Sequence, residues 1–308
     1  MTVQGTALIG LGAMGLGMAR SILGVGIALR GFDLSATALD ALAAAGGTPG
    51  RDVRDTIAGC DLVIVMVVNA AQARAVLFDD AATDALPKGA TVMLCSTMAP
   101  SDARAIADRL ADAGHLTLDA PVSGGQVGAE AGKLTVMASG PPAAFDRAAA
   151  VLDAIAGPVH RLGDAPGLGA TYKVVHQLAA SVHLVAAAEL LALGSKAGCD
   201  PEKLLEIVSG AAGSSWMLQN RGPRMLTEDP TCASSVNIFI KDLGLVLQTG
   251  REAGVPLPLA SAAHLMFTGA AAMGHGADDD SMVRRAYEVM MGAPIVARPG
   301  DAPPEDAE

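Results

Sequence analysis

The chain has 308 residues, a formal net charge of −11 and an aromatic content of only 3%. Its length suffices for two ordinary domains, and its 51% of hydrophobic residues can form a sizeable core. The acidic balance argues against nucleic-acid binding, which needs basic patches. A small anionic ligand remains compatible with it, because a local cationic pocket can form in an acidic protein.

Strand-like and helix-like runs alternate through the first half of the chain. Apolar runs at residues 6–12, 28–33, 61–68, 91–97 and 116–123 are typical of buried strands. Amphipathic runs at residues 13–26, 35–46 and 101–114 are typical of helices. This repeated order predicts an α/β fold, with a Rossmann-type doubly wound parallel sheet domain over residues 1–163.

The second half predicts an all-α helical domain over residues 164–297. Helical periodicity runs from Thr171 to about Ala197, and Asp200 is a suitable N-cap before Pro201. Further helices are expected at residues 201–212, 237–254, 257–274 and 280–292. The end of the chain, "RPGDAPPEDAE" at residues 298–308, is acidic and proline-rich, so we expect a disordered tail there.

Cysteine spacing and the N-terminus favour a cytoplasmic protein. The cysteines at positions 60, 95, 199 and 232 form no CxxC pair, which favours reduced thiols over disulfides or a metal site. The start "MTVQGTALIGLG" lacks the basic region and cleavage site of a signal peptide. The apolar run at residues 174–194 is long enough to span a membrane, but His176, Gln177 and Glu189 interrupt it. We therefore expect a buried helix of a soluble protein, with no membrane partner and no metal.

A GxGxxG motif stands between the first expected strand and the first expected helix, which is the context that dinucleotide binding requires. Its members are Gly10, Leu11, Gly12, Ala13, Met14 and Gly15. The first glycine permits a tight turn, the second lets a pyrophosphate approach the backbone, and the third lets helix and strand pack closely. The helix N-terminus then offers free N–H groups to a phosphate.

The end of the second expected strand predicts which dinucleotide is bound. Asp33 can accept hydrogen bonds from an adenosine ribose 2′-OH, and Leu34 stands where an arginine would hold a 2′-phosphate. NAD is therefore expected rather than NADP. In the alternative, the glycines serve only turn and packing, and Asp33 caps the next helix.

Other strand ends supply candidate ligand contacts, because ligands in open α/β sheets bind beyond the carboxyl ends of the strands. Val68 and Asn69 end and follow one strand, and Thr97 ends another, so we expect all three at the cofactor site. Thr97 could equally be only a turn residue. The turn Ser123–Gly125 follows the next strand, and its backbone N–H groups could bind a carboxylate or form an ordinary turn.

One lysine, Lys173, lies near the start of the long apolar helix. His176 and Gln177 lie three and four residues beyond it and Ser181 one turn further, so these polar side chains share a helix face. A buried lysine can have its pKa lowered from about 10.4 towards neutrality, and can then exchange a proton with an alcohol or carbonyl oxygen. Alternatively, Lys173 extends to solvent at the helix start. His176 and His183 are expected to be polar core groups, because no acidic cluster accompanies them at a ligand spacing.

Four stretches together resemble the β-hydroxyacid dehydrogenase family, which includes 3-hydroxyisobutyrate and tartronate-semialdehyde-type enzymes. They are "GLGAMGLGMA", "DAPVSGG", "GLGATYK" and "IKDLGLVL", in order and at family-like spacing. The resemblance implies a two-domain, NAD-dependent dehydrogenase of a small anionic hydroxy acid that assembles as a homodimer or homotetramer.

The resemblance also implies roles for individual residues. Lys173 would be the catalytic lysine, and Thr97 would lie at the nicotinamide end of the cofactor. The substrate carboxylate would bind Ser123, Gly124 and Gly125. Lys241 would reach the active site and touch cofactor or substrate, whereas the residues alone also allow a surface ion pair of Lys241 with Asp242.

The chain departs from the family pattern at Gln177, where the family usually has asparagine, and His176 precedes it. The long helix and "GAAGSSWMLQNR" resemble the branch that oxidises four-carbon sugar acids, above all L-threonate, at C2 to 2-dehydro-L-erythronate. A polyhydroxylated substrate could use His176, Gln177, Ser215 and Asn220 as partners. The alternative substrates are 3-hydroxyisobutyrate and tartronate semialdehyde (2-hydroxy-3-oxopropionate). A non-enzymatic alternative is an NAD-binding redox sensor, which keeps the glycine motif and needs no lysine.

Overall fold

The computed structural model describes residues 5–296, so the tail expected to be disordered at residues 298–308 lies outside the described residues. The chain forms two compact units, Met1–Val174 and Val175–Glu308. Helix α8 (Leu168–Lys196) begins in the first unit and continues in the second. The domain boundary expected after residue 163 stays a prediction.

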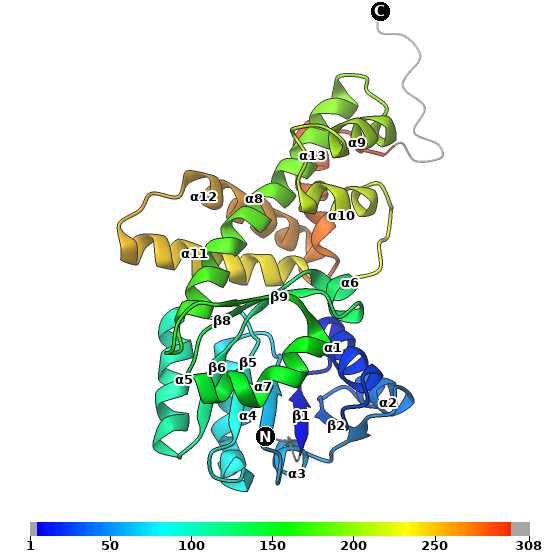
Figure 1. Ribbon diagram of the computed structural model, residues 1–308. Helices are drawn as coiled ribbons and strands as arrows, with labels where there is room; N and C mark the ends of the chain where they lie inside the picture. The colour runs from blue at the N-terminus through cyan, green and yellow to red at the C-terminus, as the bar shows by residue number, and fades with distance from the viewer. Residues whose placement is uncertain (1–4, 297–308) are drawn as a thin grey trace, which may run out of the picture. The chain divides into compact units, whose positions relative to one another are not determined.

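The first unit is built on a six-stranded sheet with the strand order β3-β2-β1-β4-β5-β6 (Figure 1). Every pairing in it is parallel. The strands are β1 (Thr6–Ile9), β2 (Leu29–Phe32), β3 (Thr48–Pro49), β4 (Leu62–Val65), β5 (Thr91–Leu94) and β6 (Leu116–Asp119). This is the order of a dinucleotide-binding doubly wound sheet, so the predicted Rossmann-type domain is confirmed.

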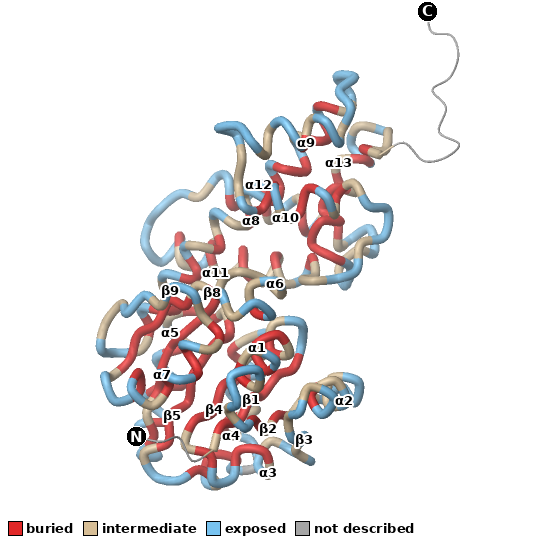
Figure 2. The backbone as a smooth tube through the Cα atoms, turned by 45° about the vertical axis from the view of Figure 1, so that its right-hand side comes forward, coloured by how far each residue is buried: buried red, intermediate tan, exposed pale blue. Residues whose placement is uncertain are grey.

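Helices cover both faces of this sheet, because its strands are apolar on both sides. Leu8 and Ile64 belong to one buried cluster, and Ala7 and Val63 belong to another. Successive residues of a strand point to opposite faces, so a continuous apolar strand needs cover on both. Figure 2 shows the central strands β1, β4 and β5 as buried. The covering helices are α1 (Ala13–Gly24), α2 (Ala36–Ala44), α3 (Val53–Ile57), α4 (Ala70–Phe78), the short η1 (Asp79–Ala85), α5 (Pro100–Asp112) and α7 (Pro142–Ile155).

The last residues of the long strands lie in one row across the sheet. Ile9 is in register with Phe32 on one side and with Val65 on the other. Val65 pairs in turn with Leu94, and Leu94 with Asp119. Because the strands are parallel, the segments that follow these residues all emerge at one edge of the sheet. That edge therefore gathers the predicted site segments of the first unit.

A second, three-stranded sheet in the first unit was not expected from the sequence. It has the order β7-β8-β9, with β7 antiparallel to β8 and β9 parallel to it. Its elements are β7 (Val122–Ser123), β8 (Leu134–Ala138) and β9 (Ala156–Arg161), with the short helix α6 (Gly125–Glu130) between the first two. The strand β9 reads "AGPVHR" and is mostly exposed, so it lacks the apolar pattern that marks a strand.

The second unit is helical, as predicted. Beyond its share of α8 it contains α9 (Pro201–Ser209), α10 (Trp216–Met225), α11 (Val236–Ala253), α12 (Pro258–Ala270), the π-helical turn η2 (Ala271–His275), the 3-10 turn η3 (Asp280–Val283) and α13 (Arg284–Met291). Asp200 caps α9 through a 2.7 Å hydrogen bond from the Lys203 N–H, and Pro201 stands at its first position. Helix α10 was not predicted, because Gly222 and Pro223 lie inside it and are read as helix breakers.

Buried ion pairs and an aromatic pair hold the second unit together. Arg221 contacts Asp280 at 2.8 Å, and Arg224 contacts Asp279 at 2.6 Å. Both aspartates are fully buried. Removing a carboxylate from water costs free energy, and the arginine partners offset that desolvation cost. Burial raises the pKa of Asp280 to about 6, although Arg221 opposes that rise. Phe239 of α11 stacks on Phe267 of α12 with 5.0 Å between ring centroids.

Helix α8 is long and apolar enough to cross a membrane by length and composition alone, with a mean hydropathy of 1.6 in its most apolar window. In this fold 44% of that window is buried, and the buried residues of the helix include Lys173, Gln177 and Ser181. His183, which we expected in the core, is exposed instead. The expectation failed because His183 lies on the outer side of a helix whose apolar residues point in several directions.

Candidate active site

The glycine motif forms the turn between β1 and α1, as predicted. Gly10 has φ +94°, and an added Cβ there would lie 2.3 Å from the Met66 carbonyl oxygen. A Cβ on Gly15 would lie 1.9 Å from the Gly10 carbonyl oxygen, so both positions require glycine. Gly12 is exposed, and a Cβ there would meet no atom within 4 Å. The open space at Gly12 is thus free for a ligand.

The N-terminus of α1 fits a pyrophosphate. Gly12 is the N-cap and supplies no side-chain hydrogen bond, so no protein side chain occupies the capping position. The first turn of α1 contains no acidic residue that would repel an anion. Exposed N–H groups at a helix N-terminus, with space in front of them, bind phosphate groups. The residues present therefore fit the diphosphate of NAD.

Asp33 joins the end of β2 to the glycine motif. Its Oδ2 accepts a 2.7 Å hydrogen bond from the Leu11 N–H, and its Oδ1 accepts one of 2.9 Å from the Ser35 N–H. Ser35, not Asp33, caps α2, by accepting from the Ala38 N–H. Leu34 is 96% exposed, so the place where an arginine would hold a 2′-phosphate presents an apolar side chain to solvent. This arrangement suits a ribose 2′-OH.

The predicted contacts at the ends of β4 and β5 lie at the same edge of the sheet. Val68 is 48% exposed, and its N–H donates to Gln72 Oε1 at 2.8 Å. Asn69 caps α4 by accepting from the Gln72 N–H at 2.9 Å, which gives it a structural role whether or not it touches a cofactor. Thr97 follows β5 and is partly buried.

The turn after β6 carries the residues expected to bind a carboxylate. Ser123 ends β7 and is partly buried. Gly124 and Gly125 have φ angles of +133° and +63°, which L side chains rarely adopt. The backbone conformation therefore requires the two glycines. It also leaves no Cβ between the turn and a ligand.

Lys173 lies in the second turn of α8 and is 6% exposed, so it does not extend into solvent. One turn further, Gln177 is 8% exposed and Ser181 is fully buried. The hydroxyl of Ser181 donates to the Gln177 carbonyl oxygen at 2.7 Å. The polar face that the sequence predicts on this helix is therefore buried rather than solvated.

A hydrogen-bond network in the second unit links three predicted site residues through Asp242. Gln177 Nε2 donates to Asp242 Oδ2 at 2.5 Å, and His176 Nδ1 lies 3.0 Å from Gln177 Oε1. Lys241 Nζ lies 2.7 Å from Asp242 Oδ1. The ion pair that the residues alone allow between Lys241 and Asp242 is thus present, but Asp242 is 2% exposed and Lys241 is partly buried. The pair is not a surface one.

Sequence reasoning treated Asp242 only as an ion-pair partner and missed its bond to Gln177. The helical period places Asp242 on the buried side of α11 beside Phe239, Leu243 and Val246, which was the one available signal. Ser215 caps α10, and Asn220 accepts a hydrogen bond from Arg221. Both proposed extra partners therefore have local structural contacts.

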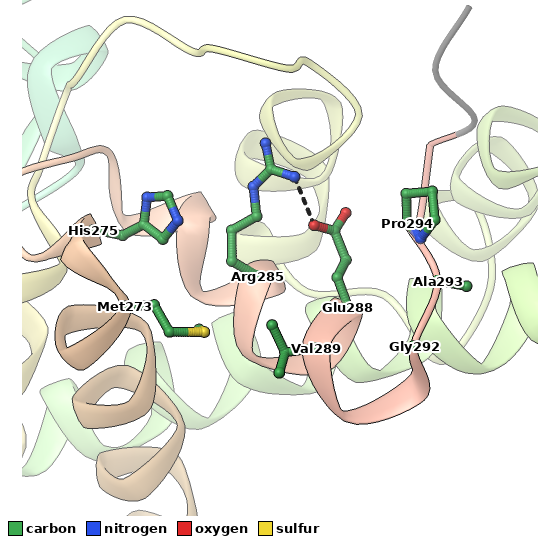
Figure 3. Close-up of a pocket in the computed structure, with 8 residues that line it drawn as sticks. All are labelled: Met273, His275, Arg285, Glu288, Val289, Gly292, Ala293 and Pro294. Carbon is green, nitrogen blue, oxygen red and sulfur yellow. Dashed lines mark hydrogen bonds and ion pairs between the residues drawn. The ribbon is translucent and has the colours of Figure 1, made fainter. Parts of the chain in front are cut away.

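A cavity of about 620 Å³ in the second unit contains none of the predicted site residues (Figure 3). His275, Arg285 and Glu288 are its charged and titratable lining groups, and Arg285 is paired with Glu288 at 2.8 Å. Across residues 5–296, no group of three or more His, Cys, Asp or Glu side chains is arranged to hold a metal ion.

Two family descriptions match consecutive parts of the chain. Residues 6–163 match the NAD binding domain of 6-phosphogluconate dehydrogenase. Residues 167–287 match the NAD-binding region of NADP-dependent 3-hydroxyisobutyrate dehydrogenase. The first match covers the whole six-stranded sheet, and the second covers most of α8 to α13.

Relatives match along nearly the whole chain. L-threonate dehydrogenase of Cupriavidus necator is 46% identical over 96% of this chain and 98% of its own. A crystal structure of 3-hydroxyisobutyrate dehydrogenase from Salmonella typhimurium is 46% identical, covers 91% of this chain and 98% of its own, and superposes with a TM-score of 0.87. The Mycobacterium tuberculosis 3-hydroxyisobutyrate dehydrogenase with L-serine is 31% identical, covers 92% and 99%, and gives a TM-score of 0.77.

These matches confirm the resemblance, the predicted fold and NAD as the cofactor. They also decide between an enzyme and a redox sensor, because the relatives matched along nearly the whole chain are oxidoreductases, two named dehydrogenases and one named a reductase. The chain belongs to the 3-hydroxyisobutyrate dehydrogenase-like family of β-hydroxyacid dehydrogenases and is an NAD-binding oxidoreductase.

Proposed function

We propose that this enzyme oxidises L-threonate at C2 to 2-dehydro-L-erythronate with NAD. The observation that carries the proposal is the Gln177–Asp242–Lys241 network, which offers a longer amide than the family's usual asparagine together with a cation. The 46% identity to L-threonate dehydrogenase of Cupriavidus necator supports the same substrate. A four-carbon sugar acid presents several hydroxyl groups that an amide can bind.

The glycine motif and Asp33 hold the cofactor in this proposal. The N–H groups at the start of α1 bind the diphosphate, and Gly10, Gly12 and Gly15 keep the backbone close to it. Asp33 accepts from the adenosine ribose, which favours NAD. Val68, Asn69 and Thr97 contribute further contacts along the same sheet edge, with Thr97 towards the nicotinamide.

The proton and the carboxylate are handled by different residues. NAD supplies the two-electron acceptor that takes a hydride from the substrate carbon. Lys173 takes the proton of the reacting hydroxyl through Nζ, as a general base. Ser123, Gly124 and Gly125 bind the substrate carboxylate through the serine hydroxyl and the backbone N–H groups.

Residues of the network select the substrate. Gln177 binds a hydroxyl of the sugar acid, with its amide oriented by Asp242 and His176. Lys241 adds positive charge that a small anion requires, although Asp242 neutralises part of it. Ser215 and Asn220 are further hydroxyl partners in this proposal.

A second candidate substrate is 3-hydroxyisobutyrate, favoured by the Salmonella typhimurium structure at 46% identity. A third is 2-hydroxy-3-oxopropionate in the reductive direction, the substrate in the name of a 30% identical Escherichia coli relative. Both lack the run of hydroxyl groups that would use the longer amide of Gln177.

The assembly and location of the protein are also proposals. We propose a homodimer or homotetramer in the cytoplasm. Exposed apolar side chains on α8 and α13, including Leu193, Val289 and Met290, support an association surface. Light scattering of the purified protein tests the assembly, and a monomer at working concentration would contradict it.

The substrate proposal is tested by a screen of NAD reduction with hydroxy acids of three to six carbons. We expect the highest kcat/KM with L-threonate, followed by product analysis showing a ketone at C2. A higher kcat/KM with 3-hydroxyisobutyrate would overturn the substrate but not the enzyme class. NADP in place of NAD should give a much lower kcat/KM.

A further inference from the structure

We propose that Asp119 is a positioning residue that, together with Ser139, fixes the start of α8 to the end of β6. It thereby sets where Lys173 lies relative to the turn Ser123–Gly125. This inference rests on the proposed function, in which Lys173 exchanges the proton and the turn binds the carboxylate. All the contacts that carry it lie within the first unit.

Asp119 and Ser139 are held together by their backbones before their side chains act. The Asp119 N–H donates to the Ser139 carbonyl oxygen at 2.9 Å, and the Ser139 N–H donates back at 2.8 Å. This isolated antiparallel bridge places the residue after β8 beside the last residue of β6. Asp119 is 1% exposed and Ser139 is 0% exposed. Neither side chain is therefore available to bulk water.

Their side chains receive the free N–H groups at the start of α8. Asp119 Oδ2 accepts from the Gly167 N–H at 2.8 Å and from the Ala170 N–H at 2.9 Å. Ser139 Oγ accepts from the Gly169 N–H at 3.0 Å and lies 3.3 Å from Asp119 Oδ2, to which it donates. The first N–H groups of a helix have no partner within the helix. Two buried side chains from elsewhere in the unit supply those partners here.

The start of α8 packs closely against the strands that carry Asp119 and Met137. A Cβ added to Gly169 would lie 2.5 Å from the Asp119 carbonyl oxygen and 2.5 Å from the Met137 carbonyl oxygen. The backbone of α8 is therefore in direct contact with both strands. Thr171 adds a hydrogen bond from Oγ1 to the Gly167 carbonyl oxygen at 2.7 Å.

The position of Asp119 in the chain connects this joint to both parts of the chemistry. Asp119 ends β6 and stands four residues before Ser123, while Ala170 stands three residues before Lys173. A shift of α8 along or around its axis would therefore move Lys173 while leaving the turn in place. Misplacing a reacting group by about 1 Å can lower a rate about 10²-fold.

The joint requires an acceptor oxygen at the position of Asp119 Oδ2, which receives three hydrogen bonds. Burial raises the pKa of Asp119, and hydrogen bonds from the Ala170 and Gly167 N–H groups and from Ser139 oppose that rise. The side-chain amide of asparagine could place its oxygen at Oδ2 and keep the same three donors, whereas alanine removes the acceptor. Asp119→Asn is therefore the conservative variant, and Asp119→Ala is the disruptive one.

The experiment compares Asp119→Ala, Asp119→Asn and Ser139→Ala in the intact protein. For Asp119→Ala we expect kcat to fall about 10²-fold with an unchanged KM for NAD, because the reacting amine moves while the cofactor site does not. Asp119→Asn should restore kcat to near the parent value. Hydrogen exchange of the amides at residues 167–171 should accelerate in the alanine variants and stay protected in Asp119→Asn.

A matched control is Asp52→Ala, since Asp52 caps α3 in the same unit by accepting from the Asp55 N–H at 2.7 Å. This variant should lose stability without losing kcat. If Asp119→Ala does not fold, Ser139→Ala decides, because it removes one acceptor and one donor at the same joint. Faster exchange at residues 167–171 with unchanged kcat in Ser139→Ala would overturn the proposal.

Failure of the proposed function gives a different result. Full turnover by Lys173→Met would show that Lys173 does not exchange the proton, whatever the Asp119 variants do. If Lys173→Met is inactive while Asp119→Ala is folded and fully active, Asp119 does not position Lys173, and the role of Lys173 still stands. Equal losses of kcat and NAD affinity in Asp119→Ala would also overturn it, since they would indicate general damage to the first unit.

Discussion

Gln177 and Asp242 are joined by a 2.5 Å hydrogen bond from Nε2 to Oδ2, although 65 positions separate them in the chain. The bond fixes which end of the Gln177 amide is which: nitrogen towards Asp242 and oxygen towards His176 Nδ1, 3.0 Å away. Asp242 also contacts Lys241 at 2.7 Å. One buried carboxylate thus orders both a neutral and a cationic candidate for substrate binding.

Shortening Gln177 should weaken substrate binding. Gln177→Asn removes one methylene, so the amide can no longer span to Asp242. We expect the KM for L-threonate to rise about tenfold or more, because a hydrogen bond to a charged group contributes about 1.5–3 kcal/mol. Steady-state kinetics measure this, with the KM for NAD unchanged. Gln248→Asn on α11 is the control, since Gln248 is an exposed residue bonded to Glu252. Equal KM values in both variants would contradict the role of Gln177.

The two glycines at the start of α1 should behave differently when replaced. Gly12→Ala has open space for its methyl group, so it should leave the melting temperature unchanged and remove the thermal stabilisation by NAD. That stabilisation is about 2.7 kcal/mol at a ligand concentration of 100 Kd. Gly15→Ala collides with the Gly10 carbonyl oxygen and should lower the melting temperature even without NAD. Thermal melts with and without NAD measure both. Normal NAD stabilisation of Gly12→Ala would argue against a diphosphate at this turn.

Asp33 and Leu34 should set the cofactor preference. Asp33→Ala removes an acceptor for the ribose, and we expect kcat/KM for NAD to fall about 10–100-fold, as for a lost hydrogen bond to a charged group. Adding Leu34→Arg should raise kcat/KM for NADP, because the exposed position 34 can then pair with a 2′-phosphate. Asp40→Ala, an exposed aspartate of α2, is the control. An unchanged NAD/NADP ratio in the double variant would show that the ribose lies elsewhere.

Asp280 should make stability depend on pH. Burial raises the pKa of Asp280 to about 6, from an ordinary value of 3.8 for an aspartate. The folded protein therefore holds this proton more tightly, so the contribution of Asp280 to stability is fully present below pH 3.8 and is lost as the pH rises through about 6. The loss is about 3 kcal/mol, because each tenfold change in proton affinity corresponds to about 1.4 kcal/mol. In urea unfolding, the free energy of unfolding of the parent minus that of Asp280→Asn should therefore be higher at pH 4.5 than at pH 7.5. The opposite trend would mean that Arg221 dominates over burial.

The sequence predicted the first unit well because its signals are local. A GxGxxG motif between a strand and a helix, followed by Asp33 at the end of the next strand, specifies both the turn and the ligand. Continuous apolar strands such as β4 likewise identify a sheet that is covered on both faces. The strand β9 and the helix α10 carry glycine and proline inside them, so tertiary contacts override their local preference.

The parts of the site that the sequence could not predict are long-range hydrogen bonds between buried groups. Asp119 appears in the sequence only as the first residue of "DAPVSGG", and its partners Gly167 and Ala170 are 48 and 51 positions away. Asp242 is likewise remote from Gln177. No helical or strand period encodes such pairs. Lys173 was identifiable because a cation next to the long apolar part of a helix, away from the helix's C-terminal end, is unusual.

Proton exchange between Lys173 and the substrate hydroxyl is tested by the variant Lys173→Met. The methionine side chain keeps the buried volume and removes the amine, and Lys196→Met, at the exposed end of the same helix, is the matched control. The measurement pairs the rate of NAD reduction with the NAD dissociation constant from calorimetry. We expect a loss of about 10²–10⁴-fold in kcat for Lys173→Met with unchanged NAD affinity, and parent values for Lys196→Met. A Lys173→Met enzyme that binds NAD and turns over at the parent rate would contradict it.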